Sequence, residues 1–207
     1  MRPLPRLLAL TTDALCRSPD FGVRAAAIAA TGPAVGIVVR APGSTAAQHA
    51  AFAERVAALC RPPEASLLVH ARPDLARAVA AQGVVQRRTD LSPGDARAVA
   101  GTAWIGASVH SADEAREAVD DGADFLLAGN VWETASHPGR PAKGLGWLEG
   151  ITAAGRPVFA IGGVTADRAA EARAAGAWGV AAISAAWEAA DPASAAAALV
   201  APWTESS

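Results

Sequence analysis

The 207-residue chain has few cysteines, a single lysine and no long hydrophobic run. Its two cysteines, Cys16 and Cys60, lack Cys-x-x-Cys spacing, so we expect neither a disulfide framework nor a zinc site. No stretch approaches the ~18 consecutive apolar residues of a membrane-spanning helix. The apolar run at 7–10 is too short for the core of a signal peptide. These absences predict a cytoplasmic protein.

The chain also has no large excess of positive or negative charge. The formal net charge is -2 at pH 7, which leaves no electrostatic footprint for nucleic acid or an anionic membrane. Arginine takes the other basic positions beside Lys143, which we interpret as a composition bias. Residues of the hydrophobic group make up 52% of the chain, many of them alanine, so a sizeable core can form.

Short apolar segments recur at fairly even intervals, and alanine-rich segments with helical periodicity separate most of them. Strands are predicted at 7–10, 35–39, 66–69, 84–86, 104–107, 125–128, 158–161 and 179–183. Helices are predicted at 46–59, 73–81, 95–100, 112–120, 166–175 and 191–201. This alternation indicates an α/β protein, and eight such strands favour a closed (β/α)8 TIM barrel over an open sheet. We expect residues 1–207 to form one domain.

The segment 156–184 is the most informative part of the chain. One apolar strand ends on Gly162 and Gly163, a helical stretch follows, and a second strand ends at Ile183 and Ser184. Paired glycines let the backbone approach a ligand closely and direct N–H groups toward it. The loops after strands seven and eight of such a barrel commonly bind phosphate. We therefore expect these four residues to hold the phosphate of a small molecule.

Histidines supply the sharpest candidates for chemistry. His110 follows the fifth strand, at the end of the barrel where catalytic residues gather. It can carry a proton near neutral pH or, alternatively, order the start of the next helix by hydrogen bonding. His70, after strand three, and His137 can face the same mouth as substrate contacts. Metal ligation is less favoured because they lack i, i+4 spacing. His49 is interpreted as a solvated helix residue.

Other polar residues follow the predicted strands. Arg40 ends strand two and can bind phosphate or carboxylate with two hydrogen bonds, or form a surface ion pair. Thr134 and Ser136 lie in the long connection at 130–144 and can bind a polar ligand. Asp90 can accept a proton, bind Mg²⁺ or cap the following helix. Ser111 and Thr165 are predicted helix caps.

The motifs resemble the thiamine phosphate synthase superfamily, which includes the TenI-like thiazole tautomerases. The similar segments are LLALTTD, LLVHARPDLARAVAAQGV, IGASVHSADEAREAVDDGADFLLAGNVWETAS and PVFAIGGVTADRAAEARAAGAWGVAAIS. The resemblance spans almost the whole chain. It implies a (β/α)8 barrel, a homodimer and a thiazole phosphate bound near the double glycine and the end of strand eight. It also implies that Thr134 and Ser136 line the site.

The same resemblance implies departures from a synthase, which uses Mg²⁺ and basic residues to remove pyrophosphate from a pyrimidine. His70-Ala71 replaces the family's Asn-Asp pair, so one metal carboxylate is missing, although Asp90 matches the second. The lysines that the resemblance implies two residues after Arg40 and at His137 are also absent. These departures favour the tautomerase branch, in which the resemblance assigns the acid and base role to His110.

We therefore expect an isomerase that aromatises a phosphorylated thiazole carboxylate without a metal. The residues expected to contact the ring and its carboxylate are Arg40, His70, Thr134, Ser136 and His137. One alternative is a divergent Mg²⁺-dependent thiamine phosphate synthase with Asp90 as a metal ligand. A second alternative is a non-catalytic barrel that binds thiazole phosphate or thiamine phosphate.

Overall fold

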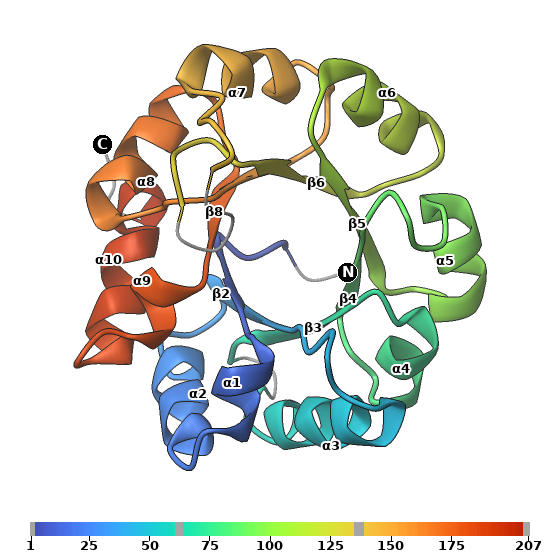
Figure 1. Ribbon diagram of the computed structural model, residues 1–207, viewed down its shortest axis with the longest axis vertical. Helices are drawn as coiled ribbons and strands as arrows, with labels where there is room; N and C mark the ends of the chain where they lie inside the picture. Colours follow the sequence, from blue (N-terminus) through green and yellow to red (C-terminus); the bar gives the residue numbers. More distant parts are fainter. Residues whose placement is uncertain (1–2, 61–63, 135–138, 205–207) are drawn as a thin grey trace.

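The computed structural model describes residues 3–60, 64–134 and 139–204 (Figure 1). Its strands are parallel and form a closed barrel in chain order, with β8 paired to β1. They are β1 Leu7–Leu10, β2 Val35–Val39, β3 Ser66–His70, β4 Gly83–Gln86, β5 Trp104–Val109, β6 Phe125–Gly129, β7 Val158–Ile161 and β8 Gly179–Ala182. The predicted (β/α)8 barrel is confirmed, and each predicted strand is found within a few residues of its expected bounds.

Helices surround the barrel as an outer ring (Figure 1). They are α1 Asp13–Arg17, α2 Phe21–Ala29, α3 Ala46–Ala57, α4 Pro73–Ala78, α5 Pro93–Ala100, α6 Ala112–Asp120, α7 Leu145–Thr152, α8 Ala166–Ala174, α9 Ser184–Trp187 and α10 Pro192–Thr204. Those not anticipated from the sequence are α1, α2, α7 and α9. Of these, α1 and α9 span five and four residues, too few for a periodic pattern to indicate a helix.

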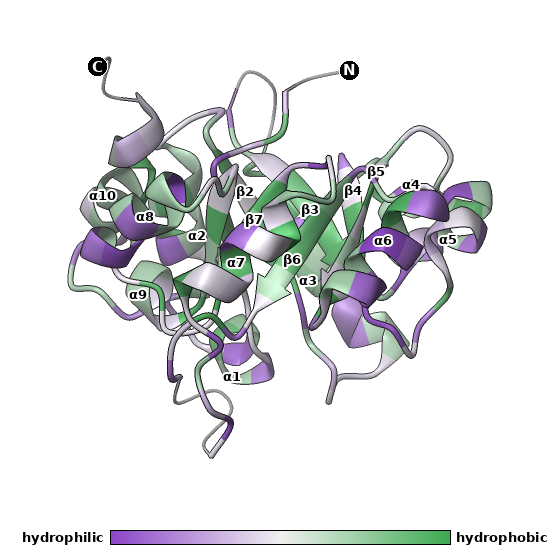
Figure 2. Ribbon diagram, turned by 90° about the horizontal axis from the view of Figure 1, so that it is seen from above, coloured by the Kyte–Doolittle hydropathy of each residue, from purple (hydrophilic) through white to green (hydrophobic). Residues whose placement is uncertain are grey.

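Alternation along the strands divides the core into two layers. Side chains that point inward fill the barrel, among them Leu68, Phe125 and Phe159. The rings of Phe125 and Phe159 meet edge to face, with centroids 5.5 Å apart. A Cβ at Gly106 would lie 2.3 Å from the Phe125 ring, so glycine there makes room for it. Outward side chains pack beneath the helices, whose outer faces are more hydrophilic (Figure 2).

The helix caps follow the sequence closely, with two differences. Ser111 and Thr165 accept hydrogen bonds from backbone N–H groups three residues on, as predicted. The Glu114 carboxylate, however, accepts from the backbone N–H of His110 at 2.7 Å rather than from that of Ser111. The alternative in which Asp90 caps the following helix is wrong, because Ser92 caps α5.

The two ends of the barrel carry different parts of the chain. The segment after β6 extends from one end, whereas both chain termini lie at the other end (Figure 2). Among the helices of the described segments, none combines the length and apolar character needed to cross a membrane.

Candidate active site

The C-terminal ends of the strands bring most of the sequence-predicted site residues to one mouth. Arg40, His70, Asp90 and His110 lie at or after β2, β3, β4 and β5, and Thr134, Gly162, Gly163, Ile183 and Ser184 follow β6, β7 and β8. This common location follows from parallel strands in a closed barrel. Ser136 and His137 lie outside the described residues.

Thr11, at the end of β1, fixes the backbone of Arg40. Its hydroxyl donates to the Arg40 carbonyl oxygen at 3.0 Å and accepts from the Arg40 N–H at 2.9 Å. It also accepts a bond from the buried Cys16 thiol at 3.3 Å. Because Thr11 is fully buried, these bonds are shielded from water and hold the start of the β2 loop in place. Sequence reasoning did not select Thr11.

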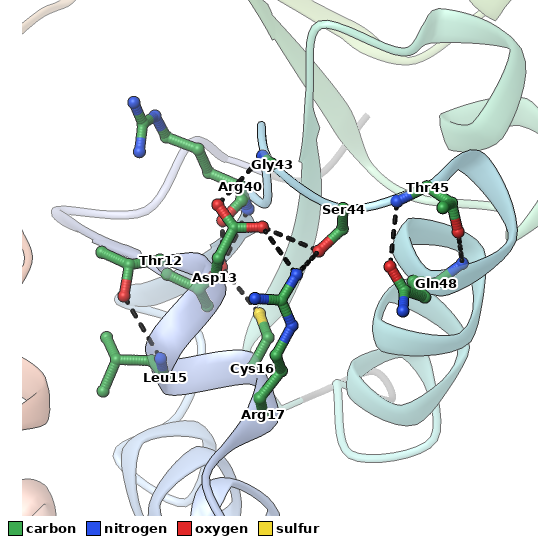
Figure 3. Close-up of polar contacts among 11 residues, drawn as sticks. Thr12, Asp13, Leu15, Cys16, Arg17, Arg40, Gly43, Ser44, Thr45 and Gln48 are labelled. Carbon is green, nitrogen blue, oxygen red and sulfur yellow. Dashed lines mark hydrogen bonds and ion pairs between the residues drawn. The ribbon is translucent and has the colours of Figure 1, made fainter.

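The Arg40 guanidinium is available to a ligand. It forms no hydrogen bond or ion pair with the described part of the chain, so the alternative of a surface ion pair is not met. The nearby Asp13 carboxylate is instead bound by Gly43 N–H, the Ser44 hydroxyl and Arg17. Figure 3 shows the Arg40 side chain extending away from this cluster. Burial and repulsion from Arg87 lower the pKa of Arg40, although Asp13 partly opposes them. An anion at the mouth would relieve this electrostatic cost.

His70 is a buried, neutral imidazole at the end of β3. The residue is 7% exposed. Burial, followed by repulsion from Arg40, lowers the pKa of His70 to about 4. At neutral pH the ring can therefore donate or accept a hydrogen bond without carrying charge. This supports a role in orienting a ligand rather than in moving a proton.

Asp90 accepts three hydrogen bonds from Arg87. The Arg87 side chain donates to both carboxylate oxygens, at 2.7 and 3.1 Å, and the Arg87 N–H adds a bond of 2.8 Å. Burial alone would raise the pKa of Asp90, but the bonds from Arg87 lower it below its usual value. Sequence reasoning noted Asp90 but did not predict this partner, because a sequence gives no side-chain direction.

The residues present do not fit a Mg²⁺ site. Both oxygens of Asp90 already accept from Arg87, and Ala71 supplies no second carboxylate. Within residues 3–60, 64–134 and 139–204, no group of three His, Cys, Asp or Glu side chains is arranged to hold a metal ion.

His110 is exposed at the mouth and held by its neighbours. Its Nδ1 lies 2.7 Å from the Gly129 carbonyl oxygen. A carbonyl oxygen only accepts, so Nδ1 carries the proton and Nε2 is the basic nitrogen. The backbone is fixed on both sides, because Glu114 accepts from the His110 N–H and Lys143 donates to the His110 carbonyl. The ring therefore contacts β6 rather than capping α6.

Lys143 and Ser108 are mouth residues that sequence reasoning missed. The Lys143 ammonium lies 4.5 Å from the centroid of the Trp147 ring. Burial, partly opposed by Glu114, lowers the pKa of Lys143. The sequence carries one signal for Lys143, because it is the only lysine in the chain. Ser108 lies on the inner face of β5, two residues before His110, and strand alternation alone indicates that position.

His49 differs from its expected place. It is 8% exposed, and its Nε2 lies 3.1 Å from the Val39 carbonyl oxygen. The interpretation as a solvated helix residue is therefore wrong. The helix α3 turns this side chain toward β2, where it satisfies a backbone group at the strand end.

The double glycine is required by close backbone packing. Gly162 and Gly163 have φ values of 97° and 68°, in the left-handed region that favours glycine. A Cβ at Gly162 would lie 2.6 Å from Asn130 Cβ, and one at Gly163 would lie 2.2 Å from the Glu133 carbonyl oxygen. These glycines therefore let the β7 loop lie against the segment after β6.

The same loops leave backbone donors at the mouth. The N–H groups of Gly163 and Ser184 donate no hydrogen bond to any other described residue. Arg168 donates to the Gly163 carbonyl at 2.6 Å, which fixes the orientation of that peptide. Free N–H groups in neighbouring loops suit an anionic oxygen.

The closed parallel barrel and the polar groups at its C-terminal mouth define a (β/α)8 barrel of the kind whose enzymes act at this end. Residues 7–186 match the family model described as thiamine monophosphate synthase, and the chain belongs to this family. The resemblance expected from the sequence is thus confirmed.

Known relatives agree. The chain is 38% identical over 112 residues to the thiamine-phosphate synthase of Thermus thermophilus, and the match covers 54% of each protein. It is 42% identical over 157 residues to that of Salinispora arenicola, covering 74% of this chain and 75% of the relative. The structure of a thiamine phosphate pyrophosphorylase from Pyrococcus furiosus has a TM-score of 0.83 and 33% identity, covering 97% of this chain and 96% of that one. The chain thus spans about half the length of the first curated relative, and these names match the synthase alternative better than the isomerase.

Proposed function

We propose that the mouth binds a phosphorylated thiazole carboxylate and converts it to the aromatic thiazole by moving a proton. The observation that carries this proposal is the geometry of His110. Its Nδ1 is fixed by the Gly129 carbonyl at 2.7 Å, which leaves Nε2 as the basic nitrogen at the mouth. A histidine held in one tautomer and exposed to a ligand is suited to take a proton and return it.

The proposed reaction balances without another reagent. Nε2 of His110 accepts a proton from a ring carbon, and the electron pair of the broken C–H bond enters the ring system. The resulting imidazolium returns the proton to a second carbon, so one C–H bond breaks and another forms. No oxidant, leaving group or cofactor is needed.

The other mouth residues hold the substrate in this proposal. The N–H groups of Gly163 and Ser184, with Gly162 and Ile183 shaping the two loops, bind phosphate. Arg40 binds the ring carboxylate, and neutral His70 adds a hydrogen bond. Thr134 and Ser136 line the ring site as the resemblance implies, and His137, which replaces a lysine of the family, completes it in this proposal.

A transferase is the second candidate, favoured by the names of the relatives. The cations Arg40, Arg87 and Lys143 at the mouth also suit a pyrophosphate group. Against it stand the paired Asp90 carboxylate and the alanine at position 71, which leave the synthase's metal without its ligands. A binding barrel without catalysis remains the third candidate.

Two parallel assays separate these functions. In the first, the protein is incubated with the non-aromatic thiazole carboxylate phosphate and EDTA. In the second, it receives the pyrimidine pyrophosphate, thiazole phosphate and Mg²⁺. His110→Asn is compared with Asp120→Asn, a change at the exposed last residue of α6, the helix that follows His110. We expect conversion in the first assay only, lowered about 10²–10⁴-fold in His110→Asn and unchanged in Asp120→Asn. Product in the second assay alone assigns the transferase, and binding without conversion in either assigns the binding barrel.

A further inference from the structure

A cavity that is open to solvent lies at the end of the barrel opposite the mouth. Its volume is about 400 Å³, within the range of small-molecule sites. The lining comes from the residue before β1, the turn before β7, the end of α8 with the turn that follows, and the end of α10. Both chain termini lie at this end of the barrel (Figure 2). None of the candidate active-site residues lines this cavity.

The cavity is strongly cationic. Arg6, Arg156 and Arg173 line it, and no acidic residue does. None of these arginines belongs to the ion pairs formed between described residues. Burial, followed by repulsion from Arg173, lowers the pKa of Arg6. Like charges gathered without an acidic partner among the described residues favour an anion between them.

Two tryptophans give the cavity an ordered aromatic wall. The Arg6 guanidinium stacks on the Trp178 ring, 3.6 Å from its centroid, and donates to the Trp178 carbonyl at 2.8 Å. The Trp178 indole N–H donates to the Pro5 carbonyl at 2.9 Å. On the other side, the Trp203 indole N–H donates to the Ala177 carbonyl at 3.2 Å. Both indoles are half-buried and line the cavity, and these hydrogen bonds fix their orientation.

We propose that this cavity binds an organic anion in which phosphate groups are joined to a flat ring, the chemistry of a nucleoside diphosphate. Arg156 and Arg173 bind the phosphate oxygens, since a guanidinium presents paired donors to phosphate. The ring lies against Trp203 and the Arg6–Trp178 stack. This site is independent of the function proposed for the mouth.

The test is isothermal titration of the full chain with ADP and, separately, with inorganic pyrophosphate. The variant is Arg156→Gln with Arg173→Gln, both exposed side chains whose loss spares the core. The matched control is Arg77→Gln, because Arg77 occupies the last turn of α4 as Arg173 occupies that of α8. We expect saturable ADP binding that the double variant weakens at least about tenfold and the control leaves unchanged.

Three results would overturn the proposal. The first is no saturable ADP binding, which would assign the arginines to stabilising helix ends alone. The second is equal weakening by Arg77→Gln, which would show a general charge effect. The third is pyrophosphate binding as tight as ADP binding, which would remove the role of the ring.

Discussion

Arg87 holds both carboxylate oxygens of Asp90, with Nη2–Oδ1 and Nε–Oδ2 distances of 2.7 and 3.1 Å. The Asp90 carboxylate, which matches a metal ligand of the synthases, is therefore already paired with the Arg87 guanidinium. The guanidinium balances its charge, and the bonds of this pair would have to break before a metal ion bound.

Removal of metal should leave the proposed isomerisation unchanged. The physical reason is that proton transfer by His110 needs no Lewis acid, and the Arg87–Asp90 pair leaves no ready site for one. The measurement is the initial rate in EDTA and in added Mg²⁺. A rate that depends on Mg²⁺ would contradict the prediction.

A metal site should be recoverable by two substitutions. Ala71→Asp restores the missing carboxylate, and its backbone φ of 60° is one that aspartate tolerates better than alanine. Arg87→Gly frees Asp90. We expect the double variant to bind Mg²⁺ in calorimetry and the parent chain not to do so. Equal binding by parent and double variant would show that the Arg87–Asp90 pair does not block the metal.

His70 should make the protein less stable in acid. Its folded pKa is about 4, against 6.5 as the ordinary value. The unfolded chain therefore binds a proton that the folded chain refuses, and stability falls as pH drops from the ordinary pKa toward the folded one. Between about pH 7.5 and about pH 5 the loss is about 2 kcal/mol. Urea unfolding of the parent and of His70→Gln measures it, and the variant should lose less stability over this interval.

Gly163→Ala should unfold more easily than the parent. The new Cβ meets the Glu133 carbonyl oxygen at 2.2 Å and sits at a φ of 68°. We expect a loss of about 2 kcal/mol or more in the free energy of unfolding. Gly150→Ala is the control, because Gly150 lies in α7 with nothing within 4 Å of an added Cβ. That change should stabilise by about 0.5–1 kcal/mol.

Thr11→Val should weaken ligand binding without touching the ligand. It removes the hydroxyl that bonds the Arg40 N–H and carbonyl. The backbone that positions the Arg40 guanidinium is then no longer held in place. We expect a stability loss of about 1–3 kcal/mol and a raised Kd for the thiazole phosphate. Thr11→Ser keeps the hydroxyl and should restore both values. Failure of serine to rescue would point to lost packing instead.

Much of the fold could be predicted because it depends on local patterns. Apolar runs such as Val35–Val39 and capped helices such as Ala112–Asp120 identify themselves within a few residues. Their regular alternation then leaves few possible architectures. Helix α1 is too short to do so, and it depends on Thr12 and on contacts with the β2 loop.

The candidate site could be predicted only as a set of positions. Strand ends place Arg40, His70 and His110 at one mouth, which the structure also shows. The Arg87–Asp90 pair and the Thr11 bonds depend on side-chain direction, which residue spacing does not contain. Whether Asp90 can bind a metal ion therefore depends on side-chain contacts that the sequence alone does not reveal.

The aromatic packing inside the barrel has a consequence for the molecule as a whole. Phe125 and Phe159 help to fill the interior of the barrel, and Gly106 makes room for the Phe125 ring. A barrel filled in this way is a core and not a conduit. The mouth and the cationic cavity thus lie at separate ends of one scaffold, and a mutation that alters the side chains of one leaves those of the other unchanged.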